Sequence, residues 1–198
     1  MVHDEIIEFL DQDSTPHKRL GDPLKLAGSK QSYHIRLLGM ATDYTKHFSK
    51  SLQLLDEIAA EAGAEVSGVS LGIMQPYTWL KYHEGFWGYA QYVTRAVMGV
   101  EGPEMGASVK VFNDTPLSVQ PGRITTFDDC KMHEAWNSSP IRRIALIFDM
   151  HAKGSISRGR QGIEELMKRL PNIEYMDSEM QDRIKVSIET AETIMSHI

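Results

Sequence analysis

The feature that most constrains the fold is a series of short apolar segments between residues 64 and 149, which Gly, Pro and Asn-Asp turns interrupt. Short strands with frequent turn residues and no helix between them predict a β-sandwich or barrel. The last segment is a continuous apolar run, typical of a strand that is covered on both faces. The expected strands are 66–73, 93–100, 108–112, 117–119, 123–127 and 143–148.

Helical patterns flank this region on both sides. Apolar residues at spacings of three and four predict a helix over 48–62 that ends at Gly63, and further helices after residue 160. We therefore expect one domain over 1–198, mainly β with flanking helices. It comprises a helical N-terminal part (1–63), a β core (64–150) and C-terminal helices (151–198).

Composition narrows the functional classes. The net charge is −6, which argues against non-specific binding of nucleic acid, where a basic face is expected. Cys130 is the one cysteine, so an intrachain disulfide and a cysteine-rich zinc site are excluded, and a reduced, cytoplasmic setting is the default expectation. The acidic N-terminus does not resemble a signal peptide, and no apolar run is long enough to cross a membrane.

Three residues carry candidate chemistry. His83 follows an expected strand, His133 lies fifty residues later, and Arg143 opens the most apolar strand. Neutral imidazole is a good ligand for Fe(II). A buried guanidinium needs an anionic partner and can bind a carboxylate through two parallel hydrogen bonds. The pattern suits a metal with a dicarboxylate cosubstrate. Two histidines with purely structural roles and an arginine in a surface ion pair would give the same pattern.

Four segments in the same order resemble the aspartyl/asparaginyl β-hydroxylase family of Fe(II)/2-oxoglutarate oxygenases. They are 73–78, His83-Glu84-Gly85, 95–99, and the stretch from Phe127 through His133 to Arg143 and Asp149. The resemblance implies a double-stranded β-helix (jelly roll). It also implies an Fe(II)/2-oxoglutarate-dependent dioxygenase that uses O2 to hydroxylate an unactivated C–H bond of a small or amino-acid-like substrate.

The resemblance also assigns roles to individual residues. His83 and His133 would ligate iron, and Arg143 would pair with the distal carboxylate of 2-oxoglutarate. Arg95 would bind a carboxylate of the cosubstrate or the substrate. Asp129 would be a hydrogen-bond partner around the site, and Trp136 would pack beside the metal loop.

The sequence departs from the family in three places. Val97 replaces a histidine, which removes one polar contact near the cosubstrate, and Gly72 replaces a serine that contacts the cosubstrate in the family. An aromatic segment containing Phe86 and Trp87 follows the first histidine, on the side where a substrate would approach or where a loop would pack. Because of this segment, the sequence does not establish that the substrate is an aspartyl residue.

Gly85 stands where most enzymes of this chemistry place a carboxylate ligand, so we predict a site with two histidines. The same His-x-Gly pattern marks 2-oxoglutarate halogenases, in which chloride fills the gap. A halogenase, or a jelly-roll binding module without metal, is therefore the alternative. Outside the site, we expect His151 in a loop or at the surface and Cys130 as a small buried apolar residue.

Overall fold

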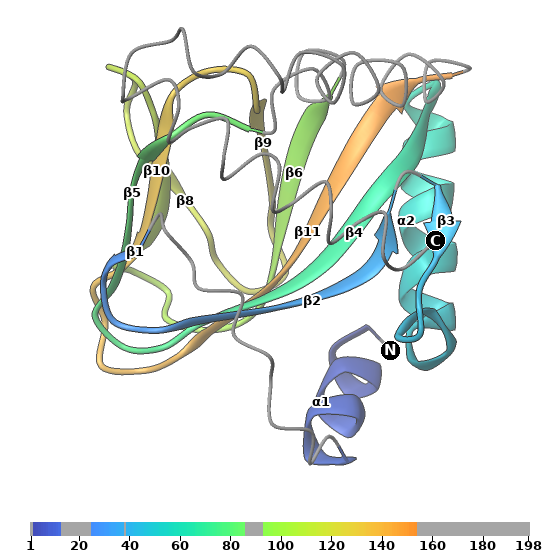
Figure 1. The fold of residues 1–198 in the computed structure, drawn as a ribbon, viewed down its shortest axis with the longest axis horizontal. Coiled ribbons are helices and arrows are strands. Elements are labelled where there is room, and N and C mark those ends of the chain that lie inside the picture. The colour runs from blue at the N-terminus through green and yellow to red at the C-terminus, as the bar shows by residue number, and fades with distance from the viewer. Residues whose placement is uncertain (1, 13–24, 38, 86–92, 154–198) are drawn as a thin grey trace, which may run out of the picture.

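The computed structural model describes residues 2–12, 25–37, 39–85 and 93–153. Two antiparallel sheets face each other (Figure 1), with strand orders β3-β2-β4-β11-β6-β9 and β1-β5-β10-β7-β8. This arrangement confirms the expected jelly roll. The strands are β1 (Lys25–Ala27), β2 (Lys30–Leu37), β3 (Met40–Ala41), β4 (Ala64–Met74), β5 (Thr78–His83), β6 (Thr94–Glu101), β7 (Ala107–Val111), β8 (Leu117–Ser118), β9 (Ile124–Asp128), β10 (His133–Asn137) and β11 (Arg143–Ala152).

Two helices cover the outer face of the six-stranded sheet, α1 (Val2–Gln12) and α2 (Ser49–Glu61). The expected helix over 48–62 is confirmed as α2, whose apolar side packs on β4 and whose end is followed by Gly63 at φ +69°. The α1 residue Glu5 accepts hydrogen bonds from the first backbone N–H groups of α2, at Lys50 (3.0 Å) and Ser51 (2.8 Å). A carboxylate at this end also suits the helix dipole.

A second core fills the space between the sheets. Successive side chains of a strand point to opposite faces, so β11 serves both cores. Its residues Ile144, Leu146 and Phe148 pack under the helices, and Ala145 packs between the sheets. Burial on both faces explains the continuous apolar run in this part of the sequence.

Two differences from the expected organisation concern the strands. The strands β1 to β3 precede residue 64, so the sheets begin well inside the part that we expected to be helical. Two further strands, β5 (residues 78–83) and β10 (residues 133–137), are absent from the expected set. The expected C-terminal helices lie outside the described residues, beyond residue 153. Neither described helix has the length and apolar character needed to cross a bilayer.

Candidate metal centre

His83 and His133 lie side by side at one end of the five-stranded sheet. His83 is the last residue of β5 and His133 the first of β10, and the register of these antiparallel strands places them directly opposite each other. Their ring centroids are 4.3 Å apart. The fold thus brings together two imidazoles that are fifty residues apart in the sequence.

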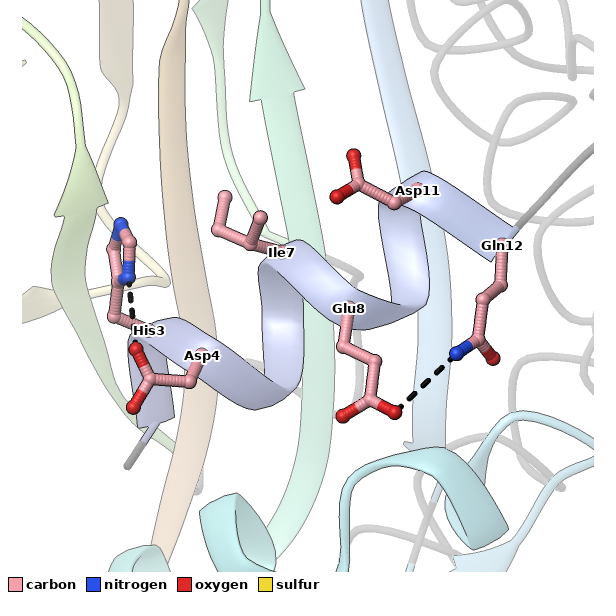
Figure 2. A pocket seen from close by; sticks show the side chains of 6 residues that line it. All are labelled: His3, Asp4, Ile7, Glu8, Asp11 and Gln12. Atoms are coloured by element: carbon pink, nitrogen blue, oxygen red, sulfur yellow. Dashed lines mark hydrogen bonds and ion pairs between the residues drawn. The ribbon is translucent and has the colours of Figure 1, made fainter.

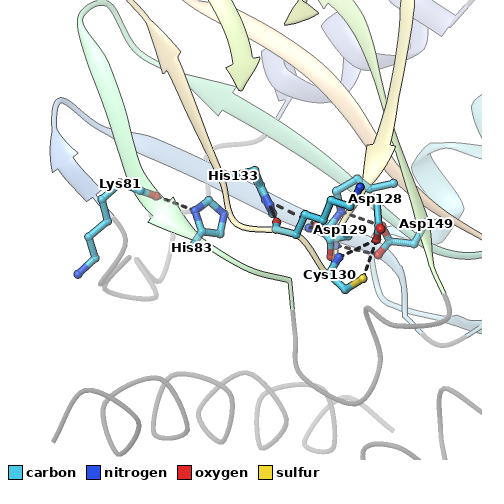
Figure 3. Close-up of polar contacts among 9 residues, drawn as sticks. Lys81, His83, Asp128, Asp129, Cys130, His133 and Asp149 are labelled. Carbon is cyan, nitrogen blue, oxygen red and sulfur yellow. Dashed lines mark hydrogen bonds and ion pairs between the residues drawn. The ribbon is translucent and has the colours of Figure 1, made fainter. Parts of the chain in front are cut away.

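Each imidazole is held in one tautomer by the backbone. Nδ1 of His83 lies 2.7 Å from the carbonyl oxygen of Lys81, and Nδ1 of His133 lies 2.8 Å from that of Lys131 (Figure 3). A carbonyl oxygen only accepts, so Nδ1 of each neutral ring carries the proton and donates it. Each Nε2 then keeps a lone pair, as in histidines that ligate metals.

Burial keeps both rings neutral. Desolvation, with a smaller contribution from His133, lowers the pKa of His83 to about 3. Desolvation also lowers the pKa of His133 to about 4, although its hydrogen bond to Lys131 opposes the shift. At neutral pH a metal ion would therefore not compete with protons for either Nε2.

A network of charged residues adjoins His133. Asp129 is fully buried, and its Oδ1 lies 3.7 Å from Nε2 of His133 and 2.6 Å from a terminal nitrogen of Arg95. Arg95 in turn binds both carboxylate oxygens of Asp149, at 2.8 and 3.0 Å. Desolvation raises the pKa of Asp129 to about 6, and the positive charge of Arg95 opposes that rise. The backbone N–H of Gly85 donates to the carbonyl of Asp129 at 2.7 Å, which joins the two histidine segments.

Asp149, the aspartate that binds Arg95, has no role among the sequence predictions. The sequence feature that could have identified Asp149 is its position two residues after Ile147, which places a carboxylate on the inner face of an otherwise apolar strand. Asp149 pairs in register with Arg95 of β6, so the two opposite charges share one face of the sheet.

Arg143 is a buried cation at the start of β11. Only 4% of its surface is exposed, and its Nε and Nη1 form no hydrogen bond with any residue that the structure describes. Desolvation lowers its pKa to about 10, which leaves the guanidinium charged at neutral pH. It lies on the same face of β11 as Ala145, which packs in the core between the sheets. A buried charge without a partner is costly, so this position suits an anionic ligand.

The two departures from the family have a packing consequence. Val97 is buried in the core between the sheets and contributes no polar group there. A side chain at Gly72 would begin 3.0 Å from Cδ1 of Ile147, so Gly72 leaves room for that isoleucine. The inner wall is therefore more apolar than the family pattern predicts.

The structure does not bring every predicted residue to this site. Trp136 lies three residues after His133, on the opposite face of β10, where it packs against Trp79 with ring centroids 5.7 Å apart. Phe86 and Trp87 lie outside the described residues.

The predictions for His151 and Cys130 are wrong. His151 is 1% exposed because β11 continues to Ala152. Cys130 is exposed, and its thiol donates to Asp128 at 2.7 Å, an interaction that raises its pKa.

A shallow pocket occurs elsewhere, beside α1 (Figure 2), and is lined by His3, Asp4, Ile7, Glu8, Asp11 and Gln12. It lies beside a helix on the outer face of the six-stranded sheet, whereas the histidine pair belongs to the five-stranded sheet. Within the described ranges, no three or more His, Cys, Asp or Glu side chains are arranged to hold a metal ion. The candidate centre consists of the two imidazoles of His83 and His133, which the strand register places opposite each other.

Comparison with known proteins identifies the family. Two solved structures share the fold at 14% identity. One is an oxidoreductase of the 2OG-Fe(II) oxygenase family from Burkholderia pseudomallei (TM-score 0.55; 76% of this chain and 78% of that chain covered). The other is a prolyl-4-hydroxylase from Pseudomonas putida (TM-score 0.52; 77% and 86%). A search of curated proteins finds no match. The model of the aspartyl/asparaginyl beta-hydroxylase family matches residues 25–153, which include both histidines and Arg143, and the chain therefore belongs to this family.

Proposed function

We propose that this protein is an Fe(II)- and 2-oxoglutarate-dependent hydroxylase, with iron held by His83 and His133. The observation that carries the proposal is the buried Arg143, whose Nε and Nη1 have no hydrogen-bond partner among the described residues. A dicarboxylate bound to the metal at one end and to this guanidinium at the other would fill the open metal positions and give Nε and Nη1 of Arg143 their missing partner. Membership of a hydroxylase family supports the same chemistry.

The donor set fits Fe(II) with open positions. Two neutral imidazoles with free Nε2 atoms are suitable nitrogen ligands, and Gly85 contributes no third ligand. Two protein ligands leave positions for the cosubstrate, for O2 and for water. The nearby carboxylate of Asp129 adds a negative charge that favours a bound cation.

The residues of this chain would bind, orient and protect the reactants. Arg143 would hold the distal carboxylate of 2-oxoglutarate, which fixes its orientation. The apolar side chains Leu80, Val97 and Phe127, in the core between the sheets, would exclude water. The bound iron and cosubstrate would supply the O2-dependent oxidation of an unactivated C–H bond. We propose a small or amino-acid-like molecule as the substrate class.

Succinate release tests this function. The protein would be incubated with Fe(II), 2-oxoglutarate and O2 in the presence of free amino acids, short peptides and nucleotides. Mass spectrometry would then seek a product that has gained one oxygen atom. We expect turnover by the wild type, loss of turnover in His83→Ala, and normal turnover in the control His47→Ala, whose ring packs on Phe9 outside the barrel. Succinate release by His83→Ala at the wild-type rate would contradict the assignment.

Halogenation is the second candidate, because Gly85 leaves a ligand position that chloride could fill. Beside His133, the two carboxylates of Asp129 and Asp149 face the single guanidinium of Arg95, and the resulting excess of negative charge would disfavour an anion in that position. We therefore expect a hydroxylated product even when chloride or bromide is in excess. A halogenated product in the same mass spectra would decide for the alternative.

A further inference from the structure

The guanidinium of Arg95 already contacts two carboxylates of this chain. Its Nε and Nη2 donate to the two oxygens of Asp149, at 2.8 and 3.0 Å, and Nη1 lies 2.6 Å from Oδ1 of Asp129. A carboxylate from a cosubstrate or substrate would have to displace one of these aspartates. The displaced group would then remain buried without its counter-charge, at a high cost in free energy.

The position of the Asp129 carboxylate depends on its ion pair with Arg95. This carboxylate is fully buried and accepts no hydrogen bond from any residue in the described part of the chain, so the ion pair with Arg95 holds it. The same Oδ1 lies 3.7 Å from Nε2 of His133, the nitrogen that keeps the lone pair. Figure 3 shows Asp129 close to His133, with Asp149 on the far side of Asp129.

We propose that Arg95 is a positioning residue and not a carboxylate-binding residue. Asp149 anchors the guanidinium, and the guanidinium holds the Asp129 carboxylate beside the metal-facing nitrogen of His133. The inference rests on the proposed function, because it takes Nε2 of His133 as an iron ligand. A cation bound there would be attracted by a fixed carboxylate that is not itself a ligand. Recognition of the primary substrate then does not use Arg95 as an anchor for a carboxylate.

Three variants test the proposal: Arg95→Gln, Arg95→Lys and Asp149→Asn. The matched control is Arg36→Gln, which removes a similar Arg–Asp pair (2.5 and 2.9 Å to Asp56) between the same sheet and α2. Asp149→Asn removes a charge and no volume, so it keeps the test available if Arg95→Gln does not fold.

The first measurements are the dissociation constant for Fe(II) alone and, with iron bound and O2 excluded, that for 2-oxoglutarate. We expect Arg95→Gln and Asp149→Asn to weaken Fe(II) binding by about ten-fold and to leave 2-oxoglutarate binding nearly unchanged. Arg95→Lys should recover part of the Fe(II) affinity, and Arg36→Gln should match the wild type. Normal Fe(II) binding combined with a large loss of 2-oxoglutarate binding in Arg95→Gln would overturn the proposal.

A second measurement needs no metal. Nitrogen NMR of the histidine rings in the metal-free protein should show the His133 signals moving in Arg95→Gln and Asp149→Asn, with smaller changes for His83. Unchanged His133 signals would overturn the proposal. A wild type that binds neither Fe(II) nor 2-oxoglutarate would instead refute the proposed function, and the NMR result would then decide the role of Arg95 by itself.

Discussion

Arg143 carries a buried charge that costs stability and that, under the proposed function, would bind 2-oxoglutarate. Its guanidinium is buried, and desolvation lowers its pKa to about 10 while it stays charged at neutral pH. In the protein without cosubstrate, this charge opposes folding. The neighbouring Arg142 offers a contrast, because it is half exposed and donates to Glu101 at 2.9 Å.

We predict that Arg143→Met raises the free energy of unfolding of the metal-free protein by about 2 kcal/mol. The same change should weaken 2-oxoglutarate binding to the iron-loaded protein by about 2–5 kcal/mol. Urea unfolding and calorimetric titration measure the two effects, and Arg142→Met serves as the control that should change neither strongly. A destabilised Arg143→Met protein that binds 2-oxoglutarate normally would show that Arg143 has a purely structural role.

The titrating groups of the site predict how stability changes with pH. His83 and His133 have folded pKa values of about 3 and 4, below the ordinary 6.5, so the unfolded chain takes up protons first as the pH falls below 6.5. As the pH falls from 6.5 to about 3, the two histidines therefore lower the free energy of unfolding progressively. Asp129 acts in the opposite sense, because its pKa is raised from 3.8 to about 6 and the folded state is stabilised as the pH falls through 6.

We therefore predict that Asp129→Asn makes the loss of stability on acidification steeper. Urea unfolding of chelator-treated wild type and variant, at steps from pH 7.5 to pH 4.5, gives the free energy of unfolding at each pH. The two curves should diverge below pH 6. Parallel curves would mean that Asp129 titrates normally in the folded protein.

At the scale of the elements, two turns hold exposed aromatic residues in an unfavourable backbone conformation. Tyr77 (φ +56°), between β4 and β5, and Phe112 (φ +41°), after β7, lie in the left-handed region that favours glycine. Their side chains are 63% and 60% exposed, so they gain little from packing. The Phe112 turn is closed by a hydrogen bond from the N–H of Asp114 to the carbonyl of Val111, at 2.9 Å.

We predict that Tyr77→Gly and Phe112→Gly each raise the free energy of unfolding by about 0.5–1 kcal/mol. The left-handed conformation costs an ordinary residue about 1–2 kcal/mol, and the greater freedom of glycine in the unfolded chain offsets part of that gain. Urea unfolding measures the change. A loss of stability in either variant would show that the aromatic ring makes contacts worth more than the backbone strain.

Sequence patterns predicted α2 and the strands β4, β6, β7, β8, β9 and β11, because their apolar residues follow the period of the structure that they form, but they did not predict β1 to β3, β5 or β10. The exceptions have physical reasons. Strand β10 begins with the polar residues His133 and Glu134, and its apolar face is only a few residues long. The buried end of β11 was missed because its polar residues Asp149 and His151 end the apolar run while the strand continues.

At the scale of the whole molecule, the histidines and Arg143 could be predicted as chemical types, but their arrangement depends on register. The pairing of β5 with β10 places His83 opposite His133, and no local pattern encodes a pairing across fifty residues. The link from Asp149 through Arg95 to Asp129 likewise joins three separate elements. The local sequence therefore indicates which residues take part, and the pairing of the strands determines which of them are in contact.

An anaerobic titration of 2-oxoglutarate into the Fe(II)-loaded protein, followed by visible absorption, tests whether His83 and His133 hold iron. A cosubstrate bound to iron through its 2-oxo acid produces a charge-transfer band. We predict a band that saturates at one equivalent in the wild type and is lost in His133→Ala. Absence of the band from the wild type, or its full retention when both His83 and His133 are replaced by alanine, would contradict iron binding by this pair.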